Sequence, residues 1–232
     1  MTRYFEYGDE ATGYLKARDP KLGAAIDAIG HVQRELEENG LFSGIVHCII
    51  GQQISSAAQK TVWKRMQANL GEVTPATVCA ASLDELQACG ITFTKAGYIK
   101  AIAERIDAGE FDLDAVERLS DAEAIAALSS LPGIGTWTAE MLLLFNLGRS
   151  DILSFGDLAI QRGMRMVYHH RKVTRALFEK YRRRYSPYGS VASLYLWAVS
   201  HGGVPGFERD FAPMTAAQKK AARKKRAASI CK

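Results

Sequence analysis

Several features that would place this chain in other classes of protein are missing from its sequence. The first twenty residues contain no apolar run of the kind that a secretory signal peptide needs. The four cysteines show neither a CxxC pair nor a repeated spacing, which argues against a zinc ribbon, a four-cysteine iron–sulfur cluster and a disulfide framework. The longest charge-free stretch, residues 39–59, is interrupted by glycines and polar side chains, so we expect a buried helix rather than a membrane span. A cytoplasmic protein with reduced thiols is therefore expected.

The composition is that of a folded protein with a sizeable core. The chain has 232 residues, of which 47% are hydrophobic, enough for one large domain or two small lobes. This excludes a disordered chain and a collagen-like fibre. No repeat of fixed period and no linker rich in proline and serine divides the sequence.

The net charge of +5 is unevenly distributed. Residues 216–232 hold seven basic residues and no acid, so the rest of the chain carries 23 basic against 25 acidic residues. Within that body, residues 161–190 carry nine basic residues and a single acid, Glu179. Two basic blocks on a nearly neutral body fit a protein that binds a polyanion. A solvated helix face followed by a solubilising tail would have the same charge pattern.

The apolar periodicity is helical almost throughout, and no segment alternates with period two for more than a few residues. Proline after Asp19 and Thr74, and capping-box patterns that begin at Ser82 and Ser120, mark helix starts. The sequence predicts an all-α fold. Helices are expected over residues 20–37, 43–70, 75–80, 83–89, 94–108, 112–117, 121–129, 136–147, 158–168, 173–184 and 188–201, with 43–70 as a central, mostly buried helix.

The strongest local signal is the run Leu131-Pro-Gly-Ile-Gly-Thr-Trp137 between two predicted helices. Glycines on both sides of Ile134 allow a tight turn and a close approach of the backbone to another surface. They also leave N–H groups unpaired at the start of a helix, where the helix dipole favours an anion such as a phosphate. A plain connection between two helices could have the same sequence.

Asp157 is a second candidate. It follows Gly156 and directly precedes the apolar start of the next helix, which makes it a good N-cap. Capping and a role as a catalytic anion are compatible for one carboxylate, so the local sequence allows both.

The run from Leu131 to Gly163 resembles the helix-hairpin-helix DNA glycosylases of base excision repair, the HhH-GPD superfamily. Within that superfamily it is most similar to the alkylpurine branch, 3-methyladenine DNA glycosylase II. Residues 17–22, 49–55 and 89–98 are similar to the same branch and occur in the same order. The resemblance therefore extends from about residue 17 to residue 205 and leaves the basic tail outside it.

The resemblance implies a glycosylase domain over residues 1–215, with two helical lobes, an active-site cleft between them and the helix-hairpin-helix near residues 121–147. The hairpin residues expected to bind a DNA phosphate are Leu131, Gly133, Ile134, Gly135 and Thr136, in some relatives with a structural monovalent cation. Asp157 matches the catalytic aspartate, whose charge stabilises oxocarbenium character at the sugar of a nucleotide flipped out of the duplex. The implied reaction is hydrolysis of the N-glycosidic bond, which leaves a free base and an abasic site.

Trp137 stands where the glycosylase/lyase members carry the lysine that forms a Schiff base with the sugar. No lysine occurs between Lys100 and Lys172, so we expect no lyase activity. A tryptophan at this position resembles the alkylpurine branch, in which an aromatic wall stacks on the flipped base. A positively charged alkylated purine would gain a cation–π energy of roughly 0.5–2 kcal/mol. Met141, one turn later, and Trp197 complete the expected base pocket, although a core role fits Trp197 equally well.

Other segments are expected to contact DNA away from the flipped base. Gln53 is the residue expected to approach the gap that the base leaves. The loop around Ile91, Thr92 and Phe93 is a candidate wedge into the base stack, or else an ordinary turn. Arg162 lies in the motif of Asp157 and in the basic block. A further hypothesis brings Tyr4, Phe5 and Tyr7 of the N-terminal segment to the base pocket.

The sequence thus predicts a monofunctional DNA glycosylase for alkylated purines such as 3-methyladenine and 7-methylguanine. The expected partner is double-stranded DNA with damaged bases, and the expected state is a monomer in the cytoplasm, associated with a bacterial nucleoid. The five histidines make no ligand spacing with cysteine or carboxylate, so we expect no catalytic metal and no cofactor. Two alternatives stay open: a glycosylase for another base, such as hypoxanthine or ethenoadenine, and a DNA-binding module without activity.

Overall fold

The computed structural model describes residues 3–36 and 40–213, and these residues form thirteen α-helices. In chain order the helices are α1 (Asp9–Arg18), α2 (Pro20–Ile29), α3 (Gly40–Gly51), α4 (Ser56–Leu70), α5 (Pro75–Ala80), α6 (Leu83–Ala88), α7 (Phe93–Asp107), α8 (Leu113–Arg118), α9 (Asp121–Ser129), α10 (Thr136–Phe145), α11 (Leu158–Tyr168), α12 (Arg175–Tyr185) and α13 (Gly189–His201). The described residues form no strand, only one isolated β-bridge between Tyr4 and Glu35. The predicted all-α fold is confirmed. The basic tail, residues 216–232, lies outside the described residues.

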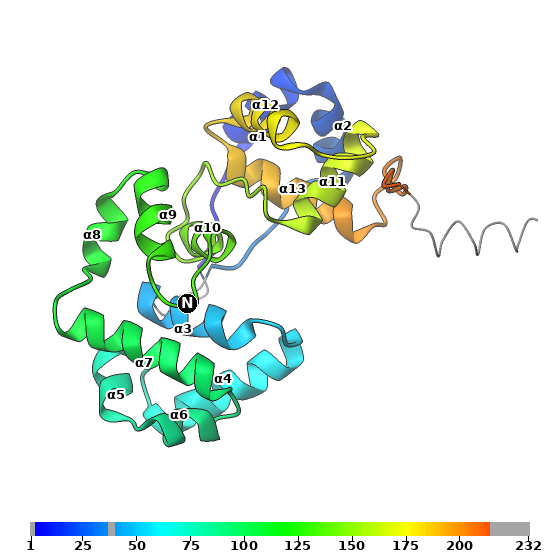
Figure 1. Cartoon of the computed structure of the whole chain (residues 1–232). Helices are drawn as coiled ribbons and strands as arrows, with labels where there is room; N and C mark the ends of the chain where they lie inside the picture. The colour runs from blue at the N-terminus through cyan, green and yellow to red at the C-terminus, as the bar shows by residue number, and fades with distance from the viewer. Residues whose placement is uncertain (1–2, 37–39, 214–232) are drawn as a thin grey trace, which may run out of the picture.

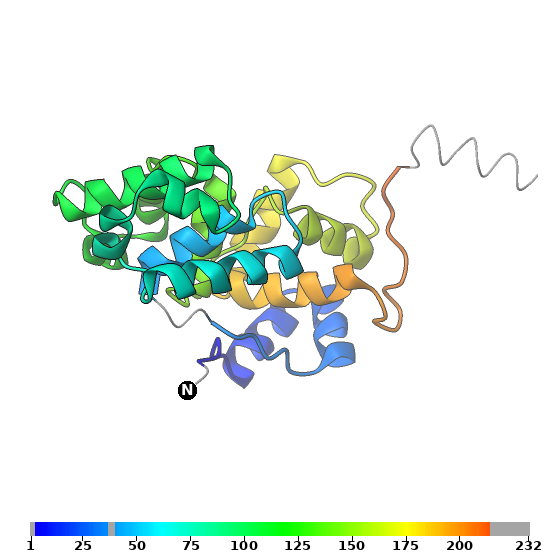
Figure 2. The same ribbon diagram turned by 90° about the horizontal axis from the view of Figure 1, so that it is seen from below.

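The helices pack around two hydrophobic cores, which define two lobes (Figures 1 and 2). The central lobe contains α3 to α10, and its buried residues run from Leu41 to Ile152. The terminal lobe brings α1 and α2 together with α11, α12 and α13 from the other end of the described chain. The chain passes from the central core to the terminal core between Ile152 and Leu153. The segment that leads to Asp157 therefore starts at the junction of the lobes.

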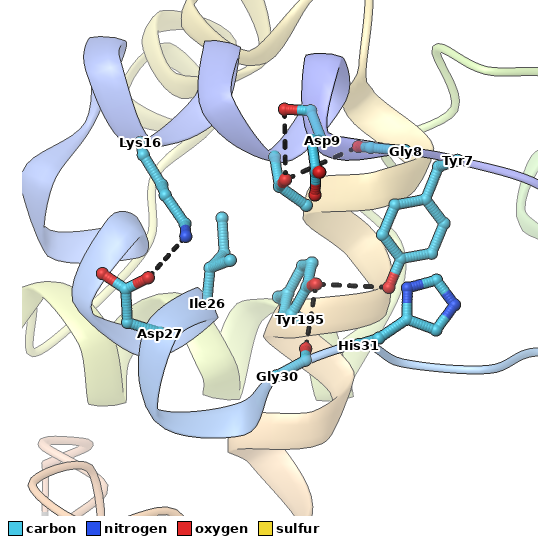
Figure 3. A pocket seen from close by; sticks show the side chains of 10 residues that line it. Tyr7, Gly8, Asp9, Lys16, Ile26, Asp27, Gly30, His31 and Tyr195 are labelled. Atoms are coloured by element: carbon cyan, nitrogen blue, oxygen red, sulfur yellow. Dashed lines mark hydrogen bonds and ion pairs between the residues drawn. The ribbon is translucent and has the colours of Figure 1, made fainter.

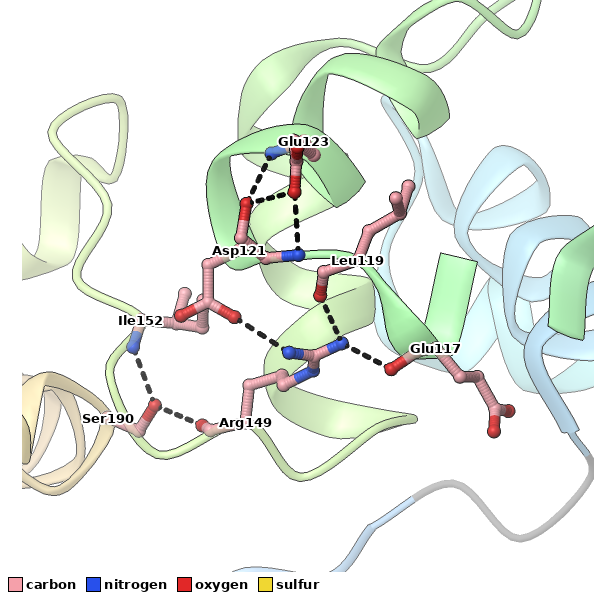
Figure 4. A network of polar contacts seen from close by, with 8 residues as sticks. Glu117, Leu119, Asp121, Glu123, Arg149, Ile152 and Ser190 are labelled. Carbon is pink, nitrogen blue, oxygen red and sulfur yellow. Dashed lines mark hydrogen bonds and ion pairs between the residues drawn. The ribbon is translucent and has the colours of Figure 1, made fainter. Parts of the chain in front are cut away.

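Hydrogen bonds fix the chain at this crossing (Figure 4). The guanidinium of Arg149 reaches Oδ1 of Asp121 at 3.3 Å and donates to backbone carbonyls at the end of α8. On the other side, the Ser190 hydroxyl of α13 donates to the Arg149 carbonyl at 2.5 Å and accepts from the N–H of Ile152 at 2.9 Å. Residues 149–152 are thus bonded to both lobes just before the site.

A buried carboxylate connects the helices of the terminal lobe. Asp19 accepts from the N–H of Leu22 at 3.1 Å, so it is the predicted N-cap of α2. Its second oxygen accepts from Arg184 of α12 at 2.6 Å and from the hydroxyl of Tyr168 at 3.0 Å, at the end of α11. These contacts join α2, α11 and α12. The predicted caps at Thr74, Ser82 and Ser120 are confirmed as well.

The prediction of one helix over residues 43–70 is wrong. The segment forms α3 and α4, separated by residues 52–55. Gln53 has a left-handed φ of 59°, and Ser55 caps α4 by accepting from the N–H of Ala58 at 3.3 Å. The Lys95 ammonium donates to the carbonyls of Ile50 and Gln52, at 2.9 and 2.6 Å, and so satisfies the end of α3. The polar residues Gln52, Gln53 and Ser55 were the available signal for this break.

The N-terminal helices also differ from the prediction. Helix α2 ends at Ile29 because Gly30 adopts a φ of 75° there. Helix α1 was not predicted, since it buries only Ala11 and Leu15 and therefore has almost no apolar periodicity. Among the described residues, no helix is both long and apolar enough to cross a membrane.

Candidate active site

Asp157 is the N-cap of α11, and its carboxylate is surrounded by N–H donors. Oδ1 accepts from the backbone N–H groups of Ala159 at 2.9 Å and Ile160 at 2.8 Å. The indole N–H of Trp137 lies 2.9 Å from Oδ2, and that of Trp197 lies 3.2 Å from Oδ1. The residue is only 7% exposed. The predicted cap is confirmed, and the carboxylate is held in one orientation by donors from three helices.

Trp137 combines this hydrogen bond with an accessible ring. It lies in the first turn of α10 and is 47% exposed, although it is large and largely apolar. Burial would stabilise such a side chain by several times the thermal energy. An exposed aromatic ring next to a buried carboxylate is suited to a ligand that stacks on the ring and presents a cationic centre to the carboxylate.

The other two predicted pocket residues lie on α10 and α13. Trp197 packs against both cores and stacks on Phe145, with ring centroids 5.7 Å apart. Met141, one turn after Trp137, is buried but belongs to neither of the two cores. The structure therefore brings Trp137 and Trp197 together at Asp157, and Met141 follows Trp137 by one turn of α10.

Two polar residues beside Asp157 were missed by the sequence analysis. Ser154 is fully buried, and its hydroxyl donates to Oε2 of Glu140 on α10. Burial raises the pKa of Glu140, and the charge of Asp157 raises it further, whereas the Ser154 bond and two arginines lower it. Glu140 is the only charged residue in the apolar helix α10, and that isolation in the sequence was the available signal.

The hairpin is a tight turn anchored in the central core. The N–H of Ile134 donates to the carbonyl of Leu131 at 3.2 Å, and both side chains are buried. Gly133 has a φ of 80°, and a Cβ there would lie 2.5 Å from the ring of Tyr98. Glycine is therefore required at residue 133 for its conformation and for space. Any contact of Leu131 or Ile134 with DNA would have to be made by the backbone.

The exposed side of the hairpin is the N-terminus of α10. Gly135 is the N-cap, and no side chain caps this helix. Gly135 and Thr136 are both exposed, and a Cβ at Gly135 would meet nothing within 4 Å. Uncapped N–H groups in the open, at the positive end of a helix dipole, are suited to an anion.

Oxygen atoms around the hairpin are of the type that a hard monovalent cation binds. The carbonyl of Leu131 accepts one N–H, and the carbonyl of Gly133 accepts Nε2 of Gln52 at 2.8 Å. The hydroxyl of Ser129, at the end of α9, is buried without a hydrogen-bond partner among the described residues. These residues fit the structural cation that the resemblance implied.

The loop between α3 and α4 lies next to the hairpin. The Gln52 side chain bonds to Gly133, and Lys95 binds the Gln52 carbonyl, so the loop is held from two sides. Gln53 and Ile54 are exposed on it, Ile54 to 41%. Gln53 thus occupies an exposed position beside the hairpin, and Ile54 is an exposed apolar neighbour that the sequence analysis did not single out.

The loop before α7 corrects one predicted DNA contact. Ile91 is 6% exposed and belongs to the central core, so its side chain is not available as a wedge. Thr92 is the N-cap of α7 and accepts from the N–H of Lys95 at 3.2 Å. Phe93, the first residue of α7, is 57% exposed. The apolar residue that projects from this loop is therefore Phe93.

Three basic side chains that could approach DNA, those of Lys95, Lys100 and Arg162, have partners within the protein. Lys100 donates to the carbonyls of Val78, Cys79 and Ala81 and so caps α5, as Lys95 caps α3. Arg162 is half exposed, with Nε 3.9 Å from Oδ2 of Asp210.

The hypothesis for the N-terminal aromatic residues is wrong for Phe5 and Tyr7. Phe5 is buried in the terminal core. Tyr7 stacks on His31 at 4.6 Å and shares a hydrogen bond of 3.2 Å with Tyr195, at a cavity of about 250 Å³ (Figure 3). That cavity is lined by residues of α1, α2 and α13 and of the segments that precede α1 and follow α2, and Asp157 is not among them.

Residues 46–187 match the model of the HhH-GPD superfamily base excision DNA repair proteins. The chain belongs to this superfamily. The matched HhH-GPD region begins within α3, contains α4 to α12, and includes the hairpin, Trp137 and Asp157.

Relatives within the superfamily cover most of the chain. DNA-3-methyladenine glycosylase 1 of Schizosaccharomyces pombe is 29% identical over 81% of this chain and 85% of its own. The crystal structure of DNA-3-methyladenine glycosidase from Bacillus halodurans has a TM-score of 0.75 and 30% identity, and covers 85% of this chain and 92% of its own. The S. pombe 3-methyladenine DNA glycosylase in complex with abasic DNA has a TM-score of 0.72 and 28% identity, over 84% and 98% of the two chains. The HhH-GPD fold is thus shared over 84–85% of this chain.

Proposed function

We propose that this protein is a monofunctional DNA glycosylase of base excision repair, which hydrolyses the N-glycosidic bond of alkylated purines in duplex DNA. The observation that carries the proposal is the buried Asp157 carboxylate bonded to the exposed Trp137, at the hairpin position where a lyase has lysine. The relatives described above are named for 3-methyladenine, and one of them is bound to abasic DNA. The glycosylase domain corresponds to residues 1–215.

DNA binding begins with the phosphate backbone. The exposed N–H groups of Gly135 and Thr136, at the uncapped start of α10, bind one phosphate, and a monovalent cation at the hairpin oxygens would supply further positive charge there. Arg162 adds a cation on α11, half exposed and only loosely paired with Asp210. Such contacts position the protein without reading sequence. Affinity should accordingly fall with salt.

The loop of Gln53 and the start of α7 lie on the side of the duplex from which the base departs. Gln53 fills the gap in the stack. The exposed ring of Phe93 and the exposed side chain of Ile54 contact the neighbouring bases. Thr92 orients Phe93 as the cap of α7. Filling the gap offsets part of the cost of unstacking the target base, about a few kcal/mol.

The flipped base stacks on Trp137, with Trp197 and Met141 enclosing the site from α13 and α10. An N3- or N7-alkylated purine carries a positive charge, which an aromatic face attracts. The same charge makes the base a good leaving group, so the site needs no strong general acid. The reaction can therefore proceed without a general acid placed next to the purine.

Asp157 acts on the sugar. As the bond from C1′ to the purine nitrogen breaks, the electron pair leaves with the base and positive charge develops on the sugar ring. The carboxylate stabilises this charge from a fixed position, since its donors already orient it, and so no reorganisation is required. Water then adds its oxygen to C1′ and gives up a proton, which leaves an abasic site.

The test is a panel of duplexes that each carry one modified base, assayed for free base and for abasic sites. Release of 7-methylguanine and 3-methyladenine is expected, with slower release of hypoxanthine and ethenoadenine because these bases are uncharged. The reverse preference would assign the site to those bases. Tight duplex binding without any release would assign the protein to the non-catalytic DNA-binding alternative.

We further propose that the enzyme acts as a monomer and is located in the cytoplasm, next to a bacterial nucleoid, where its DNA substrate lies. Sedimentation of the protein with and without duplex tests the first point. A mass of one chain per duplex is expected.

A further inference from the structure

The segment that presents Asp157 is a short turn, and α10 contacts it at two points. At one point the Trp137 indole bonds to the carboxylate of Asp157 itself. At the other, Glu140, three residues later on the same helix, accepts the hydroxyl of Ser154 at the start of the turn. The carbonyl of Ser154 accepts the N–H of Asp157 at 3.4 Å and closes the turn. Displacement of Ser154 would therefore move the backbone of Asp157.

The Glu140 contact joins the two lobes. Helix α10 packs in the central core, whereas Leu153, next to Ser154, belongs to the terminal core. On the other side of the turn, Gln161 of α11 donates to the Phe155 carbonyl at 2.7 Å, but this bond lies within the terminal lobe. Among the described residues, the structure shows two side-chain hydrogen bonds to residues 154–156. The bond from Glu140 connects the turn to α10, the helix that carries the Trp137 ring.

A carboxyl group in this place is costly for folding. Glu140 lies in an apolar helix, next to the buried Ser154, and burial raises the pKa of the Glu140 carboxyl. A well-packed apolar residue is usually at least as stabilising as a buried ionisable one. Glu140 also lines a cavity of about 280 Å³ with Arg175 and Arg182, yet its polar contact is with Ser154. Stability therefore does not explain the residue, whereas geometry at the site does.

We propose that Glu140 is a positioning residue for the reaction: through Ser154 it sets the distance between Asp157 and the Trp137 ring. This inference rests on the proposed glycosylase function and adds a residue to it. It requires the contact rather than the charge, because a glutamine oxygen can accept the same hydroxyl. A displacement of about 1 Å between reacting groups can cost about a hundredfold in rate.

The experiment measures single-turnover release of 7-methylguanine from one duplex, together with the Kd for a duplex that contains an abasic-site analogue. Glu140→Ala and Ser154→Ala are each expected to slow release about tenfold or more, with Kd changed less than about threefold. Glu140→Gln is expected to stay within about threefold of the wild type. The double variant Glu140→Ala/Ser154→Ala should be no slower than either single variant, because both remove one contact. Glu179→Ala, which removes another carboxylate from the same cavity without touching Ser154, is the control and should match the wild type.

The outcomes separate this inference from the proposed function. Equal release by the wild type and Glu140→Ala would overturn the inference alone, as would a Glu140→Gln variant as slow as Glu140→Ala, or additive effects in the double variant. A parallel loss of rate and of duplex affinity would point to general misfolding and would also overturn it. If Glu140→Ala does not fold, the comparison of Ser154→Ala with Glu140→Gln decides. Absence of release by the wild type would refute the proposed function itself, and the inference with it.

Discussion

The indole N–H of Trp137 donates to Oδ2 of Asp157 at 2.9 Å, although the two residues are twenty positions apart and begin different helices. Oδ1 of the same carboxylate accepts the two backbone N–H groups that cap α11. Oδ1 also accepts the Trp197 indole N–H at 3.2 Å, so the cap of α11 uses one oxygen and leaves Oδ2 at the exposed Trp137 side chain. This division allows Asp157 to be at once a structural cap and a charge available to a ligand.

Asp157→Asn should abolish nearly all base release while leaving the fold and duplex affinity close to wild type. If the amide oxygen keeps the cap, the amide nitrogen faces the Trp137 N–H, donor against donor, and the negative charge is lost. Removal of one preorganised electrostatic group typically costs about a hundredfold or more. Single-turnover release and circular dichroism measure the two effects. Turnover equal to wild type would mean that the catalytic anion is another residue.

Replacing Trp137 should separate stacking from hydrogen bonding. Trp137→Phe keeps an aromatic face and loses the bond to Asp157, whereas Trp137→Ala loses both. The alanine variant should lose more activity on cationic 7-methylguanine than on neutral hypoxanthine, by a factor of about 2–30, which corresponds to a cation–π energy of roughly 0.5–2 kcal/mol. The comparison is the ratio of the two release rates in each variant. An unchanged ratio in Trp137→Ala would show that the ring does not read the charge of the base.

Gly135→Asp should weaken binding to every duplex, damaged or not. The residue is exposed at the uncapped start of α10, so the new carboxylate would compete with a phosphate for the same N–H groups. Gly135→Ala is the matched control, because a Cβ there meets nothing within 4 Å and should cost little. Fluorescence anisotropy with damaged and undamaged duplexes gives both Kd values. A loss confined to the damaged duplex would contradict the assignment of this helix start to a phosphate.

The stability of the Glu140→Gln variant, compared with that of the wild type, should increase as the pH rises. Burial raises the pKa of Glu140 above its ordinary value of 4.5, so the neutral form of this carboxyl is more favoured in the folded state than in the unfolded chain. The stability that this protonation contributes is complete below pH 4.5 and is lost as the pH passes through the raised pKa. The Tm of the variant minus that of the wild type should therefore increase between pH 4 and pH 8, as paired thermal melts would show. A constant difference would contradict the direction of the shift.

The enzyme should release bases without cutting the strand. Trp137 cannot form a Schiff base, and the ammonium groups of Lys95 and Lys100 are bound to carbonyls at the ends of α3 and α5. Borohydride during turnover should trap no covalent protein–DNA adduct, and nicks should form only after alkali or heat. An efficient adduct that survives blocking of the N-terminal amine would contradict monofunctional chemistry. Lys95, Lys100 and the exposed Lys172 would then be replaced in turn.

The elements of this protein that follow from local sequence were predictable. Proline after a capping residue marks the start of α2 and α5, and Asp157 before an apolar run marks the start of α11. The glycines on both sides of Ile134 indicate a tight turn, which the structure forms with a φ of 80° at Gly133. These features depend on backbone groups within about four residues, so a few consecutive side chains determine them.

Where periodicity was the only guide, the prediction was less complete. The break at residues 52–55 separates α3 from α4, and the ammonium of Lys95, forty-three residues away, satisfies the Gln52 carbonyl there. Ile91 and Phe93 are both apolar residues of one loop, and only the packing of the central core decides that the first is buried and the second exposed.

The sequence by itself determined the helical fold, the hairpin and the carboxylate that begins α11, because each is encoded in a short run of residues whose backbone needs are local. Only the tertiary structure decided that Trp137, Trp197 and Asp157 meet, and that Glu140 reaches Ser154. These side chains come from helices of two lobes with separate cores, and the way in which the lobes pack is a property of the whole set of buried surfaces. The packing of the lobes therefore cannot be predicted from the spacing of residues along the chain.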